Sequence, residues 1–332
     1  MEFQIKWAEN DEDWDFFYKL GFEMLKTLRR FIYDPMVEKN PDASEEELLE
    51  IHRKETEGYF DFTKSDARVF IAKNDDGVRC GYLWIGGRNS KDAWDTEDPQ
   101  WVYDIVVDPT FRGHGLGIKL MQKGEEFASE LNLNLGLFVH SDNTPAIALY
   151  EKMGYQIKQV PVSRVFRYDS QDIPLGDDFI VREMKDDEYD TIIEAEFDQF
   201  KKKVEFSVDV DVDMEKKLHQ KHLEIYFSEK ERHRRFVALT NDDEIVGTIW
   251  IGSSGFSFNK LIAKFHEITI NVHNQSEKIG EYLVNFAQNW ARKNKFSSTY
   301  ILLHSTDSLE VDFFKERGYK VPGFFMEKRL KE

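Results

Sequence analysis

The stretch Val106–Gly117, which reads VVDPTFRGHGLG, decides the fold of this chain. An apolar run ends at Asp108-Pro109, and three glycines follow within five residues. Apolar residues then recur at helical spacing, at Leu116, Leu120, Met121, Phe127, Ala128 and Leu131. The stretch therefore predicts a strand, a glycine-rich turn and an amphipathic helix, in that order.

The glycine-rich turn predicts a phosphate site. Glycines adopt positive φ and let the backbone come close to a ligand. The first amides of the following helix lack partners within the helix, and they point at the same ligand together with the positive end of the helix dipole. Two rival phosphate motifs fit poorly. Gly117 is not followed by the Lys-Ser/Thr of a Walker loop, and the next strand ends in His140 instead of an acidic residue.

A second motif lies downstream. Asn143-Thr144-Pro145 is a helix start with a capping side chain ahead of proline, and Gly154 is placed to end that helix in a left-handed conformation. With these residues the chain resembles the GNAT superfamily of N-acetyltransferases. Arg112–Gly117 matches its Arg/Gln-x-x-Gly-x-Gly/Ala signature. Asn143–Tyr155 matches its Asn-x-x-Ala-x-x-Leu-Tyr-x-x-x-Gly-Phe/Tyr signature.

The resemblance implies acetyl-CoA as co-substrate and no metal. The turn would hold the pyrophosphate through backbone amides, the preceding strand would pair with the pantetheine arm, and Asn143 would hold that arm. Tyr150 would act as general acid toward the leaving thiolate, since a phenol can donate a proton to sulfur; the alternative is a packing aromatic. The cofactor-binding residues implied are Ile105, Val106, Val107, Arg112, Gly113, His114, Gly115, Leu116, Gly117 and Asn143. The side chain of His114 is expected to be a solvent-exposed bystander.

The general base is expected on the strand before the turn. Asp104 is the favoured candidate, with a strand-capping role as the alternative. Further acidic residues lie farther back, at Asp95, Glu97 and Asp98. Tyr103 stands where many family members carry a glutamate, so this chain departs from the family pattern at the base. In the family the base often acts through a water molecule.

Composition narrows the range of partners. The formal net charge of −18 argues against nucleic acid, because phosphate binding depends on clustered Lys and Arg. An acidic surface instead favours cationic small molecules or basic peptide termini. Cys80 is the only cysteine, so no disulfide is possible within the chain. The sequence shows no signal peptide and no apolar run of about 18 residues, which predicts a cytoplasmic protein that does not bind membranes.

The second half of the sequence repeats the order of elements in the first. A polar linker at 169–178 separates residues 1–170 from residues 177–332, and we expect two GNAT-like α/β domains, each a mixed, mostly antiparallel sheet flanked by helices. The first ends in a strand around 163–168, and the second includes helices at 186–199 and 212–227. The second copy lacks the residue types that the first copy offers for phosphate binding, for the general acid and for the pantetheine arm. Lys278 replaces Gly115, Phe314 replaces Tyr150 and Asp307 replaces Asn143, whereas Gln275 and Gly280 keep permitted residue types. It is predicted to be non-catalytic, although Lys278 could still contact a phosphate by its charge.

The favoured function is transfer of the acetyl group of acetyl-CoA to a primary amine, by direct attack in a ternary complex. One alternative is transfer of another acyl or aminoacyl group. Another is a CoA-binding sensor or scaffold without turnover. The sequence leaves the acceptor and the oligomeric state open. Aromatic and acidic residues in the expected acceptor region favour a cationic, partly apolar small molecule or peptide; they are Phe31, Tyr33, Trp94, Asp95 and Glu97.

Overall fold

The structure is a computed structural model. It describes residues 2–28, 30–59, 61–62, 66–87, 99–166, 171–203, 213, 216–217, 220, 233–253, 262–270, 276–303 and 308–330. Within these ranges, no helix is long and apolar enough to cross a membrane.

The first half of the chain runs from β1 to β6. Its elements are β1 (Phe3–Trp7), α1 (Asp11–Leu28), α2 (Arg30–Lys39), α3 (Glu45–Tyr59), β2 (Arg68–Asn74), β3 (Arg79–Gly87), β4 (Gln100–Val107), α4 (Leu116–Glu130), β5 (Leu135–His140), α5 (Thr144–Lys152) and β6 (Gln156–Val165). A single 3₁₀ turn, Pro109–Phe111, lies between β4 and α4.

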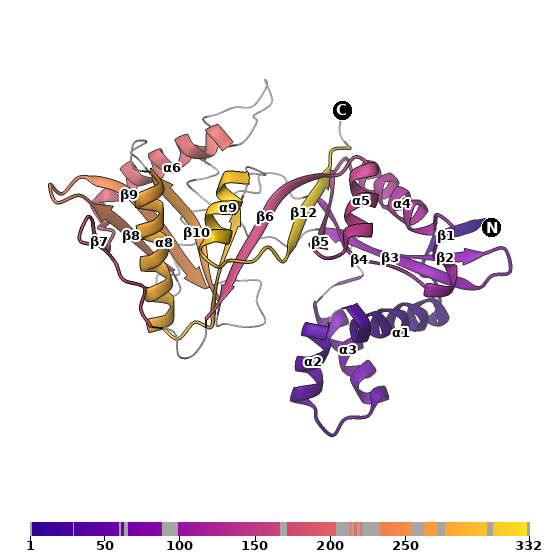
Figure 1. Ribbon diagram of the computed structural model, residues 1–332. Helices are drawn as coiled ribbons and strands as arrows, with labels where there is room; N and C mark the ends of the chain where they lie inside the picture. Colours follow the sequence, from indigo (N-terminus) through magenta and orange to yellow (C-terminus); the bar gives the residue numbers. More distant parts are fainter. Residues whose placement is uncertain are drawn as a thin grey trace.

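The second half runs from β7 to β12 and repeats this order. Its elements are β7 (Ile180–Glu183), α6 (Tyr189–Lys203), β8 (His233–Leu239), β9 (Ile245–Ser253), β10 (Ile262–Ile270), α8 (Ser276–Lys293), β11 (Ser298–Leu303), α9 (Ser308–Glu316) and β12 (Gly323–Lys328). The repeat confirms the tandem arrangement expected from the sequence. Each half contributes strands to a mostly antiparallel sheet with helices packed on it, as Figure 1 shows.

The two halves are joined by exchanged strands. The described strands form one sheet in the order β1-β2-β3-β4-β5-β12-β6-β11-β10-β9-β8-β7. The last strand of the chain, β12, therefore lies between β5 and β6 of the first half (Figure 1). In return, Val160–Val165 of β6 pairs with β11 of the second half. Each half thus completes the sheet of the other.

The core beside the glycine-rich turn lies between α4 and the sheet. Leu116, Leu120 and Met121 of α4 are at most 1% exposed and pack against β3 and β5. Burial of each such side chain contributes about 1.5–3 kcal/mol. Met326 of β12 belongs to the same cluster, so the end of the chain helps to form the core of the first half. A separate cluster, which includes Phe17 of α1, packs on β2, β3 and β4.

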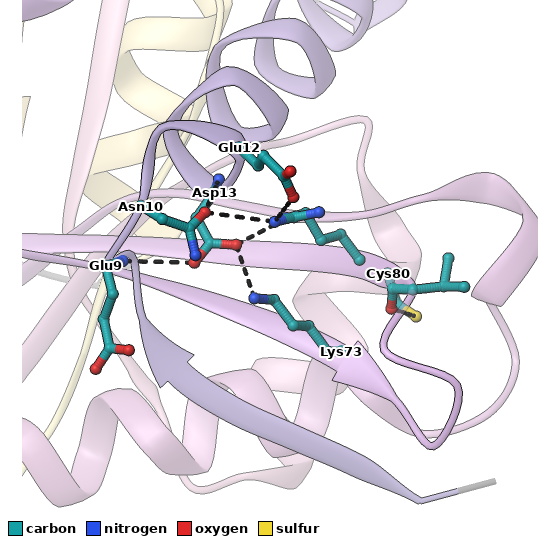
Figure 2. Close-up of polar contacts among 8 residues, drawn as sticks. Glu9, Asn10, Glu12, Asp13, Lys73 and Cys80 are labelled. Atoms are coloured by element: carbon teal, nitrogen blue, oxygen red, sulfur yellow. Dashed lines mark hydrogen bonds and ion pairs between the residues drawn. The ribbon is translucent and has the colours of Figure 1, made fainter.

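A buried carboxylate anchors the start of α1 to the β2–β3 hairpin, as Figure 2 shows. Asp13 is 2% exposed and accepts hydrogen bonds from Arg79 Nε at 2.7 Å and Lys73 Nζ at 2.8 Å. Burial raises the pKa of Asp13, but the hydrogen bonds and charges of Lys73 and Arg79 outweigh it and hold the pKa below its usual value. This contribution to stability is therefore present above the unfolded pKa of about 3.9 and is lost as the pH falls through the lower folded value.

Two sequence expectations about the first half are wrong. The strand expected around 163–168 begins seven residues earlier, because the chain is already extended at Gln156 and buries Val160 and Val162 between neighbouring strands. An unexpected helix, α2, contains Pro35 in its interior. In the second half, the helix predicted at 212–227 lies largely outside the described residues. The domain limits 1–170 and 177–332 stay a prediction.

Candidate active site

β4 and β5 separate at one end of their pairing. They run parallel and pair only at Gln100–Leu135, Trp101–Gly136 and Val102–Leu137. Beyond this point β4 continues to Val107 and β5 to His140, while β4 remains paired with β3 on its other side. Among the described strands, none pairs with the open edge at Ile105–Val107. Its backbone N–H and C=O groups can therefore pair with an extended ligand, as an added strand would.

The glycine-rich turn begins where β4 ends. Asp108 caps the start of the 3₁₀ turn. Its carboxylate accepts hydrogen bonds from Thr110 N at 2.8 Å and from Thr110 Oγ1 at 2.6 Å. Gly113 and Gly115 have φ of +81° and +76°, as the sequence predicts, and a Cβ on either would meet no atom within 4 Å. Gly115 is the N-cap of α4 and offers no side-chain cap. The first-turn amides of α4 therefore lack a side-chain cap, which leaves them available to an anion.

The charged side chains of the turn bind the protein itself. Arg112 Nε donates to the carbonyl of Val107 at 3.2 Å, and His114 Nδ1 lies 3.3 Å from the carbonyl of Phe111. Both residues are exposed. The roles expected for Arg112 and His114 at the phosphate stay predictions.

Helix α5 places Asn143 and Tyr150 beside the opening. Asn143 is the N-cap of the helix and accepts from Ala146 N at 3.4 Å, and Gly154 ends the turn after it with φ of +89°. Tyr150 is 6% exposed, and its ring centroid lies 5.8 Å from that of Tyr155. Burial, and secondarily the negative charge of Asp104, raise the pKa of Tyr150 to about 12. The phenol is therefore protonated at neutral pH and can act as an acid.

Asp104 lies at a β-bulge in the open part of β4. It is opposite Trp84 of β3, whereas Val102 is opposite Ile85, so Tyr103 is the extra residue. Asp104 Oδ2 accepts a hydrogen bond of 2.7 Å from the hydroxyl of Tyr82. Because Asp104 also acts electrostatically on Tyr150, the structure brings together the acid and the base that the sequence suggests.

Sequence reasoning missed the contacts around these two residues. It did not find the Tyr82 hydroxyl, and it did not find that Tyr103 stacks on Trp84 with ring centroids 5.1 Å apart. Of the residues expected at the acceptor, Tyr33 is described and packs against Phe22 of α1; its role at the acceptor stays a prediction. The other acceptor and base candidates lie outside the described residues or have side chains that do; they are Phe31, Trp94, Asp95, Glu97 and Asp98.

The described residues of the second half differ from this site at two aligned positions. α8 begins at Ser276, so Lys278 lies in its first helical turn, whereas the aligned Gly115 lies outside α4 with positive φ. Lys278 Nζ pairs with Asp178 Oδ1 at 2.9 Å. Phe314, which aligns with Tyr150, is 5% exposed and packs on Tyr319. Gln275 and Asp307 lie outside the described residues. In the described ranges, no cluster of three or more His, Cys, Asp or Glu side chains could hold a metal ion.

The separated parallel strands and the glycine-rich turn agree with the fold that the sequence resemblance implies. Residues 27–155, which are less than half of the chain, match the Acetyltransferase (GNAT) family. A crystal structure of a GCN5-related N-acetyltransferase from Sphaerobacter thermophilus covers 99% of this chain and 96% of its own, with a TM-score of 0.57 and 16% identity. That likeness shows that the fold extends over both halves.

Two curated relatives match parts of the chain. A mycothiol acetyltransferase from Saccharomonospora viridis is 29% identical over 134 residues, which are 37% of this chain and 40% of that protein. A streptothricin acetyltransferase from Streptomyces lavendulae is 36% identical over 92 residues, which are 27% of this chain and 46% of that protein. The match thus spans less than half of the length of either relative.

Proposed function

We propose that the first half transfers the acetyl group of acetyl-CoA to a primary amine. The observation that carries this proposal is the convergence of three features at one end of β4. They are the open edge at Ile105–Val107, the exposed amides after Gly115, and the protonated Tyr150. An extended pantetheine arm suits the first feature, a pyrophosphate the second and a leaving thiolate the third.

The proposed reaction proceeds in a ternary complex. The amine nitrogen attacks the thioester carbonyl, a C–N bond forms and the C–S bond breaks. Tyr150 donates its proton to the departing sulfur, and the nitrogen loses a proton to Asp104, directly or through water. Asn143, at the N-terminus of α5, would hold the pantetheine arm. No covalent enzyme intermediate is needed.

The acceptor is proposed to be a small molecule or a peptide with a cationic amine. Two observations support this class. The net charge of −18 favours the approach of cations, and relatives include acetyltransferases named for mycothiol and streptothricin. We also propose that residues 1–170 carry the reaction and that residues 177–332 are non-catalytic, on the strength of Lys278 and Phe314.

Release of free CoA thiol from acetyl-CoA tests the proposal. The purified chain is incubated with polyamines, aminoglycosides and peptide N-termini, and the acetylated product is identified by mass. We expect thiol release that depends on an amine acceptor. Parallel reactions with propionyl-CoA, succinyl-CoA and an aminoacyl donor test the alternative acyl groups. Turnover with none of the acceptors, together with tight CoA binding, would instead favour a sensor.

A further inference from the structure

We propose that Tyr82 is a positioning residue that holds the Asp104 carboxylate at the open edge of β4, and that Gly21 is small because this hydroxyl needs its space. The proposal rests on the proposed function, since it assigns Asp104 to proton removal from the acceptor. It concerns two residues that neither sequence motif contains. Both lie outside the turn and α5.

The Tyr82 hydroxyl is fixed from three directions. Its side chain is 1% exposed, and its ring meets Phe17 of α1 edge-to-face at 4.9 Å. The hydroxyl donates to Asp104 Oδ2 at 2.7 Å. A Cβ built on Gly21 would lie 2.9 Å from the same hydroxyl oxygen, closer than real Cβ contacts allow. The α1 backbone therefore forms one wall of the pocket that holds the phenol.

Gly21 lowers the stability of the helix that contains it, so its presence calls for a reason. It lies inside α1, Asp11–Leu28, where glycine is less stable than alanine. The helix cannot easily move away to make room, because Asp13 fixes its first turn to Arg79 and Lys73 (Figure 2). A helical glycine at this point therefore keeps the hydroxyl of Tyr82 within reach of Asp104.

The hydrogen bond has a geometric consequence. It holds Oδ2 of the Asp104 carboxylate against β3, at the bulge of β4. Tyr150 of α5 lies within electrostatic range of the same carboxylate. Tyr82 therefore fixes the orientation of the group proposed to accept the proton of the amine.

Tyr82→Phe and Gly21→Ala test the proposal by different routes. Tyr82→Phe removes the donor and keeps the ring. Because a hydrogen bond to a charged group contributes about 10- to 100-fold in an equilibrium, kcat should fall by about 10-fold or more. The Kd for acetyl-CoA should not change, since Tyr82 lies away from the turn.

Gly21→Ala keeps every functional group but places a Cβ against the Tyr82 hydroxyl, so kcat should fall. The gain in helix propensity offsets part of the steric cost, and Tm should stay the same or fall. Gly58→Ala is the matched control. Gly58 is also helical, in α3, but a Cβ there would meet no atom within 4 Å. That variant should keep wild-type kcat.

A readout that needs no acceptor separates this proposal from the proposed function. The Asp104 carboxyl is followed by ¹³C NMR at neutral pH and assigned with Asp104→Asn. Its chemical shift should differ between Tyr82→Phe and wild type, because the variant lacks the hydrogen bond. An unchanged chemical shift, or an unchanged kcat in both variants, overturns the positioning role. If wild type acetylates no acceptor but the chemical shift moves, the proposed function fails and only the hydrogen bond of Tyr82 to Asp104 stands.

Discussion

Replacing Tyr150 with phenylalanine is expected to lower kcat by about 10²–10⁴-fold, the usual contribution of a positioned general acid. The variant loses one oxygen, and its ring can keep its place against Tyr155. Acetyl-CoA should therefore bind as tightly as in wild type. Steady-state kinetics at saturating acetyl-CoA, together with a direct Kd, would separate the loss of rate from a loss of binding.

The pKa of Tyr150 sharpens this expectation. Because burial and Asp104 raise that pKa to about 12, the phenol keeps its proton across the neutral range, and it should produce no basic limb below about pH 10. Tyr155→Phe is the matched control, since it removes the hydroxyl of the neighbouring buried tyrosine and should leave kcat near wild type. A Tyr150→Phe enzyme with more than about a third of the wild-type kcat would contradict the assignment of Tyr150 as the acid.

Removing β12 is expected to unfold the first half, although the deleted residues lie at the far end of the chain. Deletion of residues 322–332 removes β12, which pairs with β5 from His140 to Leu135. It also leaves part of β6 without a neighbouring strand. It removes Met326 from the core, where such a loss alone costs about 2–5 kcal/mol. The lost strand hydrogen bonds add about 0.5–1.5 kcal/mol each, so the sum approaches the whole stability of a domain, about 5–15 kcal/mol.

Thermal unfolding followed by circular dichroism, and acetyl-CoA binding at 25 °C, measure this effect. Lys328→Ala is a milder comparison. It breaks the 2.8 Å ion pair of Lys328 Nζ with Glu125 Oε2 and removes the ammonium that lies over the Tyr155 ring, but it keeps the strand. It should lower Tm by a few degrees and leave binding intact. A truncated chain that still unfolds cooperatively and binds acetyl-CoA like wild type would show that the exchanged strand is dispensable.

The glycine-rich turn and the start of α5 could be predicted because their determinants are local. Positive φ at Gly113 and Gly115 and the cap at Asn143 follow from residue types within a few positions of one another. The inserted strand could not be predicted in the same way. Pairing of Gly323 with His140 joins residues that are distant in sequence, and any strand with the right alternation could have filled that place.

The contacts of Asp104 depend on which residues of β3 and β4 lie opposite each other. The spacing of residues along the sequence does not show this pairing. Tyr82 and Asp104 are diagonal neighbours on antiparallel strands, and they meet because Tyr82 pairs with Val106 and Trp84 with Asp104. The packing role of Gly21 also could not be predicted from the sequence. A glycine inside an amphipathic helix is a visible irregularity, but its reason, the approach of a phenol from β3, appears only once α1 is packed on the sheet.

Calorimetric titration with acetyl-CoA tests the central claim most directly. We expect one site per chain in wild type and no binding in Gly115→Glu, because that substitution puts a side chain and a negative charge where the pyrophosphate belongs, at φ of +76°. Gly77→Glu is the matched control: Gly77 has φ of +78° in the β2–β3 turn, so it carries similar backbone strain and should still bind. Two sites would contradict the loss of function in the second half, and no binding by wild type would contradict acetyl-CoA as the donor.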